Sequence, residues 1–296
     1  MTHRHYFSVA RISAVDRIEG WTVYRELFDE LLDDENVSSS MAPFYLLPDW
    51  VFDILHEFVY QFQGFRQFRA SVHSSARKHK VDVNDPSSSA PHNLLENLAV
   101  LANNTDAWAV ESVMQYLTRL MDVGTSSTVP AYQYLGIFAS VALSRLECLM
   151  GDYTSCLDSG RAVMSESSGI SVTVDGETLP SNEIVQSVFG ARLSWAYHAG
   201  VAYLMLRRYK DAIRTLGGIC SYMQRGFKVR SMSVLPHLVH LQSHLIFVSV
   251  YGCFAQVLTL NDVLIPFPPG FRFGSSRWTA SLLAISDRAV PQPSRL

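Results

Sequence analysis

The stretch LPDWVFDILHEFVYQFQGF, residues 47–65, places aromatic and aliphatic side chains at helical spacing beside a thin polar strip. Pro48 and Asp49 are helix-start signals, because proline is tolerated in a first turn and aspartate accepts its unpaired amides. The pattern predicts a helix with a wide apolar face, built to pack within its own domain or against another protein. Two rows form that face: Trp50, Ile54, Phe58 and Phe62 at intervals of four, with Val51, Leu55 and Val59 beside them.

The rest of the chain predicts further helices separated by polar segments. Apolar residues recur at helical spacing over 21–32, 92–102 and 108–121, the last helix carrying Trp108 on its apolar side. Residues 71–91 are rich in serine and have no periodicity, which is typical of a linker. Four regions are therefore expected: an N-terminal helical region at 1–70, the linker at 71–91, a helical-repeat region at 92–252 and a proline-rich tail at 253–296.

Two segments beyond residue 140 share the register of a helical hairpin repeat of tetratricopeptide type. The clearer copy comprises Gly200, Tyr203, Tyr209, Ala212 and Leu216, and the weaker one comprises Gly151, Tyr153, Cys156 and Gly160. Small residues let paired helices approach closely, and aromatic residues fill the groove between hairpins. Since Tyr153 and Tyr209 are 56 residues apart and a standard repeat has about 34, the prediction is an all-α fold with irregular repeats.

Catalytic and metal-binding motifs are incomplete in this sequence. His56 and Glu57 begin an HExxH motif, but Tyr60 occupies the position of the second histidine. His237, His240 and His244 could share a helix face, yet no acidic residue or cysteine adjoins them. No glycine-rich phosphate loop and no GxSxG elbow occurs. The sequence therefore predicts no enzyme, no metal, no cofactor and no small-molecule substrate.

Cysteine spacing and hydropathy indicate in which cellular compartment the chain is expected. Cys148, Cys156, Cys220 and Cys253 are dispersed, which favours free thiols in a reducing compartment over a disulfide framework or zinc site. Residues 245–260 are strongly apolar but shorter than the roughly 20 residues that a bilayer requires. A buried helix is favoured there over a membrane helix. No export signal is evident at the N-terminus, so the chain is expected to be cytoplasmic.

A local basic cluster contrasts with the formal net charge of -3, which gives no broad attraction to nucleic acid. The cluster comprises Arg207, Arg208, Lys210 and Arg214. Arg207 and Arg214 share a helical side if no turn separates them. The cluster is either a solvated hairpin turn or a patch for rRNA phosphate or an acidic partner. A second basic run at 77–80 lies in the expected linker and is interpreted as solubilising.

Three ordered blocks resemble subunit L of eukaryotic translation initiation factor 3. They are LPDWVFDILHEFVYQFQGFRQFR at 47–69, LGIFASVALSRLECLMGDY at 135–153 and GVAYLMLRRYKDAIRTLGGICSYMQR at 200–225, with a weaker match at 2–12. The resemblance covers roughly residues 2–252. It implies helical repeats leading into a PCI-type module, whose winged helix is expected to be missing because the tail carries five prolines where the family continues in helices.

The resemblance also implies a function. It is that of a non-catalytic scaffold subunit that packs against sister subunits, notably K and E, and supports assembly on the small ribosomal subunit. The residues expected in helix packing or at an interface are Trp50, Phe58, Phe62, Tyr203, Tyr209 and Ala212. Two alternatives stay open: a tetratricopeptide-like adaptor that binds peptides, and a PCI subunit of the proteasome lid or signalosome.

Overall fold

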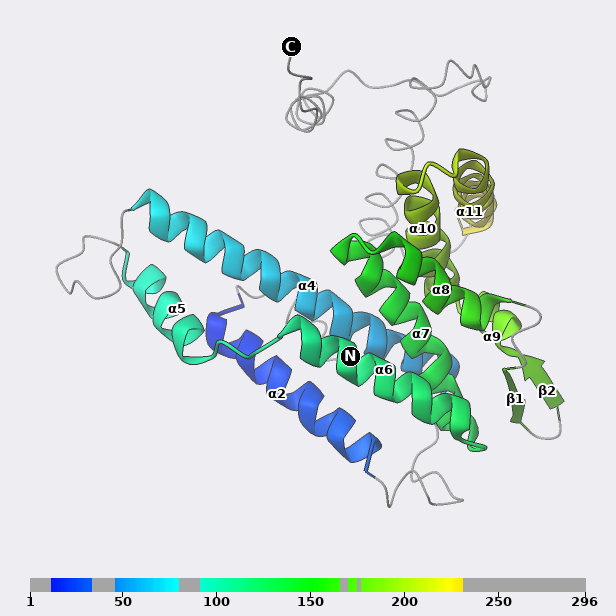
Figure 1. Ribbon diagram of the computed structural model, residues 1–296, viewed down its shortest axis with the longest axis horizontal. Coiled ribbons are helices and arrows are strands. Elements are labelled where there is room, and N and C mark those ends of the chain that lie inside the picture. The colour runs from blue at the N-terminus through cyan, green and yellow to red at the C-terminus, as the bar shows by residue number, and fades with distance from the viewer. Residues whose placement is uncertain (1–11, 34–45, 80–90, 166–169, 175–176, 231–296) are drawn as a thin grey trace, which may run out of the picture. The chain divides into compact units, whose positions relative to one another are not determined.

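The computed structural model describes residues 12–33, 46–79, 91–165, 170–174 and 177–230 (Figure 1). These residues all belong to one compact unit, Met1–Val250. They are almost entirely helical, which confirms the prediction of an all-α fold. In chain order the elements are α2 (Ala14–Leu31), α4 (Pro48–Lys78), α5 (His92–Asn103), α6 (Val110–Ser126), α7 (Pro130–Met150), α8 (Tyr153–Met164), β1 (Ser171–Val174), β2 (Glu177–Pro180), α9 (Ser181–Ser187), α10 (Phe189–Met205) and α11 (Tyr209–Arg230).

Helix α2 begins at a capping box and packs its aromatic face against α4. The Ser13 hydroxyl accepts from the Asp16 amide, and the Asp16 carboxylate accepts from the Ser13 amide, so two amides of the first turn are satisfied. The Phe28 and Phe58 rings meet edge to face at 4.9 Å, and Trp21 lies 5.2 Å from Trp108. Such ring pairs add stability beyond the area that they bury.

Trp108 lies in the turn before α6 and not inside that helix, which corrects the predicted start at residue 108. Its φ of 54° is uncommon for a bulky residue and costs on the order of 1–3 kcal/mol. The indole is buried, and its N–H donates to the Arg17 carbonyl at 2.8 Å. Burial and this hydrogen bond offset the backbone strain and fasten the turn to α2.

Helix α4 runs to Lys78, so residues 71–78 of the expected linker are helical. Val72 explains the extension, because this buried side chain gives the helix an apolar anchor inside the serine-rich segment. Residues 80–90, the rest of that linker, lie outside the described residues. Phe58 and Phe62 of this helix are buried, whereas Trp50 near its start is 63% exposed, so of the two expected roles an interface stays open for Trp50. Each four-residue step advances about 40° beyond a full turn, so Trp50 and Phe62 point about 120° apart.

Helices α6 and α7 cross at two glycines. A Cβ placed on Gly124 would lie 2.4 Å from the Gly136 Cα, so neither position has room for a side chain. The close approach helps to bury α7, whose residues from Leu135 to Cys148 are all buried. A helix that is apolar on all sides belongs in the centre of a domain. Helix α7 accordingly contacts α4, α6, α8 and α10.

The segment between α8 and α10 contains a small antiparallel sheet and a short helix. β1 pairs with β2 from Ser171 opposite Pro180 to Val174 opposite Glu177. Helix α9 follows at once, and the Ser181 hydroxyl donates to the Val163 carbonyl of α8 at 2.7 Å. The segment that makes the repeat longer than a standard one is therefore hydrogen-bonded to α8. Among the helices of the described ranges, none has both the length and the hydropathy needed to cross a bilayer.

Candidate functional site

The turn between α7 and α8 is a Schellman motif built on a left-handed glycine. Gly151 has φ 87°, its amide donates to the Cys148 carbonyl at 3.2 Å, and the Asp152 amide donates to the Glu147 carbonyl at 3.0 Å. Asp152 then caps α8, because its carboxylate accepts from the Ser155 amide at 3.0 Å. The first hairpin thus closes within two residues.

The turn between α10 and α11 repeats this geometry 56 residues later. Arg207 has φ 58°, and the Arg208 amide donates to the Tyr203 carbonyl at 2.8 Å. Arg207 corresponds to Gly151, and Tyr209 corresponds to Tyr153. The two copies proposed from the sequence are therefore helical hairpins with matching turns.

Small residues lie at the close contacts of the second hairpin. A Cβ on Gly200 would lie 2.4 Å from Leu216, and Ala212 is buried. Tyr203 is half-buried, while Tyr209 is 37% exposed. In the first hairpin the Ser144 hydroxyl donates to the Cys156 carbonyl at 2.7 Å.

Gly160 of α8 lies at a close contact between the first hairpin, α7 and α8, and the second, α10 and α11. A Cβ there would lie 1.7 Å from the Trp195 ring of α10, so only glycine admits the ring. Cys156 of the first hairpin and Ala202 of the second also share one buried cluster, against which Tyr153 and Tyr203 pack. The hairpins therefore pack side by side with their turns at the same edge.

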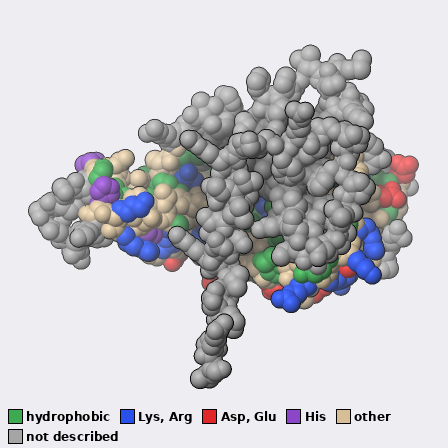
Figure 2. All heavy atoms as spheres, turned by 90° about the horizontal axis from the view of Figure 1, so that it is seen from above, with side chains coloured by type: hydrophobic (Ala, Val, Ile, Leu, Met, Phe, Trp, Pro, Cys, Tyr) green, Lys and Arg blue, Asp and Glu red, His purple; other side chains and the backbone are tan. Residues whose placement is uncertain are grey.

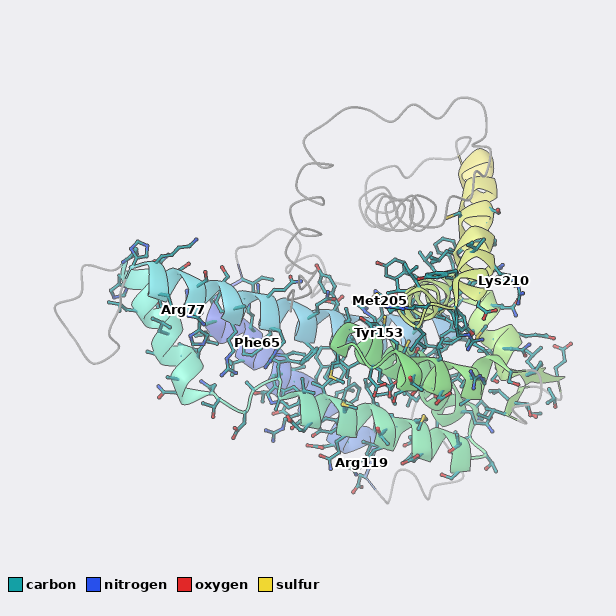
Figure 3. The ribbon with its side chains drawn as sticks, turned by 45° about the horizontal axis from the view of Figure 1, so that its top comes forward. Phe65, Arg77, Arg119, Tyr153, Met205 and Lys210 are labelled. Carbon is teal, nitrogen blue, oxygen red and sulfur yellow. The ribbon has the colours of Figure 1, made fainter. Side chains whose placement is uncertain are left out.

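That edge exposes apolar side chains at both turns. We call it the turn surface; it comprises Leu149, Met150, Met205 and Leu206, each between 38% and 54% exposed. Leu149 corresponds to Met205 in the 56-residue register, and Met150 corresponds to Leu206. Figure 3 labels Met205 and Tyr153 beside the two turns. Sequence reasoning missed these residues, although the repeated LM and ML pairs before each turn are a visible signal.

The predicted basic cluster is divided by the second turn. Arg207 lies in the turn itself, so it shares no helix face with Arg214. The Asp211 carboxylate forms ion pairs with the guanidinium groups of Arg208, at 2.8 Å, and Arg214, at 3.6 Å. The Arg208 guanidinium also lies over the Tyr203 ring, 4.7 Å from its centroid. Lys210, at the start of α11, and Arg207 form no ion pair within the described part of the chain.

A buried polar cluster joins α4 to α7. The Arg145 guanidinium lies 3.0 Å from Nδ1 of His56 and donates to Oε1 of Gln63 at 3.1 Å. Burial lowers the pKa of Arg145 to about 10, and the nearby Glu57 carboxylate opposes the shift, so the group stays protonated at neutral pH. His56, the first residue of the partial HExxH motif, is therefore engaged by an arginine. The signal for this cluster was a single arginine inside the apolar stretch 135–150.

His198 of α10 extends the polar contacts to the second hairpin. Its Nδ1 lies 2.7 Å from the Ser194 carbonyl, and its own carbonyl accepts from the thiols of Cys148 and Cys156 at 3.7 and 3.9 Å. Burial, with the Arg145 charge as a second cause, lowers the pKa of His198 to about 4. The imidazole is therefore neutral at pH 7.

The cysteines of the described region are free thiols. The hydrogen bond with Cys156 and burial raise the pKa of Cys148, and burial raises the pKa of Cys220 to about 11. Within the described ranges no three His, Cys, Asp or Glu side chains lie close enough to hold a metal ion. Cys253, the histidines at 237, 240 and 244, the apolar stretch at 245–260 and the tail at 253–296 lie outside the described residues.

Comparison with known proteins places the chain in a family. A family described as RNA polymerase I-associated factor PAF67 matches residues 16–243. The chain belongs to this family. Proteins named eukaryotic translation initiation factor 3 subunit L are similar to it: that of Nematostella vectensis is 28% identical over 244 residues, covering 75% of this chain and 39% of the relative.

Vertebrate relatives give the same result. The subunit L of Danio rerio is 30% identical over 245 residues, which cover 75% of this chain and 36% of the relative. That of Homo sapiens is 30% identical over 233 residues, which cover 72% and 35%. The chain thus spans less than two fifths of the length of these relatives. In this PAF67 family member, the matched residues include both hairpins up to the end of α11.

Proposed function

We propose that the chain is a non-catalytic scaffold subunit of eukaryotic translation initiation factor 3, acting in the cytoplasm in the assembly of initiation complexes on the small ribosomal subunit. The names of its relatives support membership of that factor. The repeat region, residues 92–252, would form the start of a PCI-type module. Its sister subunits, K and E foremost, would be the partners.

The turn surface is the observation that carries this proposal. Apolar side chains are exposed at the corresponding positions of two turns that lie at the same edge of the hairpins, and exposed apolar side chains gathered on one surface mark protein interaction sites. Methionine suits a contact surface because its flexible side chain adapts to a partner. Since the turns are fixed by matching Schellman motifs, the patch is preorganised and little conformational entropy would be lost on binding.

The basic residues beside the second turn supply the polar rim that such an interface needs. Arg207 and Lys210 flank Tyr209, and neither forms an ion pair within the described part of the chain. Acidic side chains of a sister subunit would complement them. Charge pairs at a rim speed association more than they strengthen it.

Affinity purification of the full chain from a eukaryotic lysate, followed by mass spectrometry, tests the proposal. We expect initiation factor 3 subunits, with K and E enriched over the others. Recovery of RNA polymerase I subunits, as the family description would suggest, would assign the chain to that assembly. Proteasome lid subunits or chaperones would instead support the PCI-lid or peptide-adaptor alternative and contradict the proposal.

A further inference from the structure

The C-terminal half of α4 carries a row of basic side chains. From residue 58 to residue 81 the sequence contains no Asp or Glu. Within this stretch Arg66, Arg69, His73 and Arg77 are spaced three or four apart, so they share one side of the helix; we call them the basic row. Figure 2 shows Lys, Arg and His side chains gathered towards the end of the molecule where α4 ends, and Figure 3 labels Arg77 there.

Among the residues that the structure describes, the arginines of the row have no carboxylate partner. Arg66, Arg69 and Arg77 form no ion pair within the part of the chain that the structure describes, and Arg66 and Arg77 are exposed. Elsewhere the same chain pairs its arginines: Arg161 with Asp158 at 3.2 Å, and Arg208 with Asp211 at 2.8 Å. Basic side chains gathered without acidic ones create a local positive potential, whatever the net charge of the chain.

Helix stability does not account for the row. Arg77 lies in the last turn of α4, where a cation interacts favourably with the helix dipole. Arg66 and Arg69 lie more than two turns before the end, and the dipole effect is confined to the last turn. Arg77 and Lys78, expected in a linker, belong to helix α4, so their side chains are held in a fixed register with Arg66 and Arg69.

The surroundings of the row distinguish between two classes of partner. Stable protein interfaces usually centre on exposed aromatic or aliphatic anchors, and among the described residues 61–79 no large apolar side chain is exposed. The neighbours that are exposed, Gln67, Ser71 and Ser74, carry hydrogen-bond donors. Cations with polar donors and no apolar anchor suit a phosphate backbone, which is bound through charge and hydrogen bonds alone.

We propose that the basic row binds the phosphate backbone of RNA. Each guanidinium can donate two parallel hydrogen bonds to one phosphate, and the row extends about 16 Å along the helix, which is long enough for successive phosphates of one strand. The contact is expected to be independent of base sequence because the three guanidinium groups of the row bind phosphate oxygens, which are the same at every nucleotide. This inference goes beyond the proposed scaffold function and does not depend on it.

Fluorescence anisotropy with the full chain and a labelled 20-nucleotide oligouridine, at several salt concentrations between 50 and 200 mM, tests the proposal. The triple variant Arg66→Gln, Arg69→Gln, Arg77→Gln removes three charges and keeps good helix formers. The control variant Arg25→Gln, Arg119→Gln, Arg161→Gln removes three exposed arginines from α2, α6 and α8. Circular dichroism of all three proteins verifies that each is folded.

We expect the triple variant to lose affinity on the order of 100-fold at 0.1 M salt and its log–log salt slope to fall by about 2, since each single-strand phosphate contact contributes about 0.7. The control variant should bind like the native chain. Absence of binding by the native chain at 50 mM salt, or equal losses in both variants, would overturn the proposal. Polyglutamate that binds more tightly than oligouridine of equal charge would also overturn it and assign the row to an acidic protein. None of these results affects the recovery of initiation factor subunits.

Discussion

The two hairpins share one backbone design but realise it with different residues. Both turns close with the same pair of hydrogen bonds, yet the left-handed position is Gly151 in the first hairpin and Arg207 in the second. The first hairpin is the more deeply buried, because its α7 is enclosed by α4, α6, α8, α9 and α10. The comparison teaches that the register and the hydrogen bonds of the turn are kept although the left-handed position, which is exposed in both hairpins, holds different residues.

Matched truncations in the second helix of each hairpin should show the largest difference. Leu157 of α8 is buried, and Ile213, at the corresponding position of α11, is half-buried. Leu157→Ala should destabilise the chain by about 3 kcal/mol and Ile213→Ala by about 1 kcal/mol, because the cost follows the cavity and the area exposed. Denaturant unfolding measures both. Equal losses would show that the second hairpin is buried as deeply as the first.

Acidification should give the second largest effect, by lowering the free energy of unfolding through His198, which lies between the hairpins. His198 has a pKa of about 4 in the folded chain, against about 6.5 in an unfolded one, so the unfolded chain takes up the proton first. Stability from this group is therefore complete above pH 6.5 and is lost as the pH falls towards 4. We expect a loss of about 2 kcal/mol between pH 7.5 and pH 5 in urea unfolding. In His198→Gln that part of the pH dependence should disappear, and its persistence would assign it to another group.

Replacing a glycine by alanine should destabilise the chain more at the contact between the hairpins, at Gly160, than at the contact within the second hairpin, at Gly200. Gly160→Ala drives a Cβ into the Trp195 ring, which cannot turn aside as easily as the Leu216 side chain that faces Gly200. We expect Gly160→Ala to cost about 2 kcal/mol and Gly200→Ala about 1 kcal/mol, after the gain in helix propensity. Thermal unfolding of both variants compares them. A larger loss of stability for Gly200→Ala would show that the contact within the second hairpin is the less tolerant of the two.

Exchanging the turn residues should give the smallest effects, with opposite signs. Gly151→Ala places a Cβ in the left-handed region and should destabilise by about 1 kcal/mol. Arg207→Gly relieves the same strain and should stabilise by about 0.5 kcal/mol, since glycine also loses more backbone entropy on folding. Precise urea midpoints resolve the two signs. Destabilisation by Arg207→Gly would mean that the arginine side chain stabilises the turn.

Local signals in the sequence predicted the hairpins, since small residues and tyrosines at fixed offsets depend only on helix and turn geometry. The polar cluster escaped prediction because Arg145 and His56 are 89 residues apart and meet only through tertiary packing. Trp50 was grouped with the buried Phe58 and Phe62, although its side chain is exposed, because counting in steps of four ignores the drift against the 3.6-residue period. The end of α4 was obscured by serine-rich composition, although the buried Val72 anchors that part of the helix.

The proposed scaffold function is tested most directly by the quadruple variant Leu149→Ser, Met150→Ser, Met205→Ser, Leu206→Ser in the full chain. Quantitative purification from lysate should recover at least tenfold less of the initiation factor 3 subunits than the native chain does, while thermal unfolding changes little because these side chains are exposed. A matched variant, Val15→Ser, Val23→Ser, Leu27→Ser, alters exposed apolar residues of α2 and should recover the subunits fully. Undiminished recovery by the quadruple variant would contradict the assignment of the turn surface as the docking site.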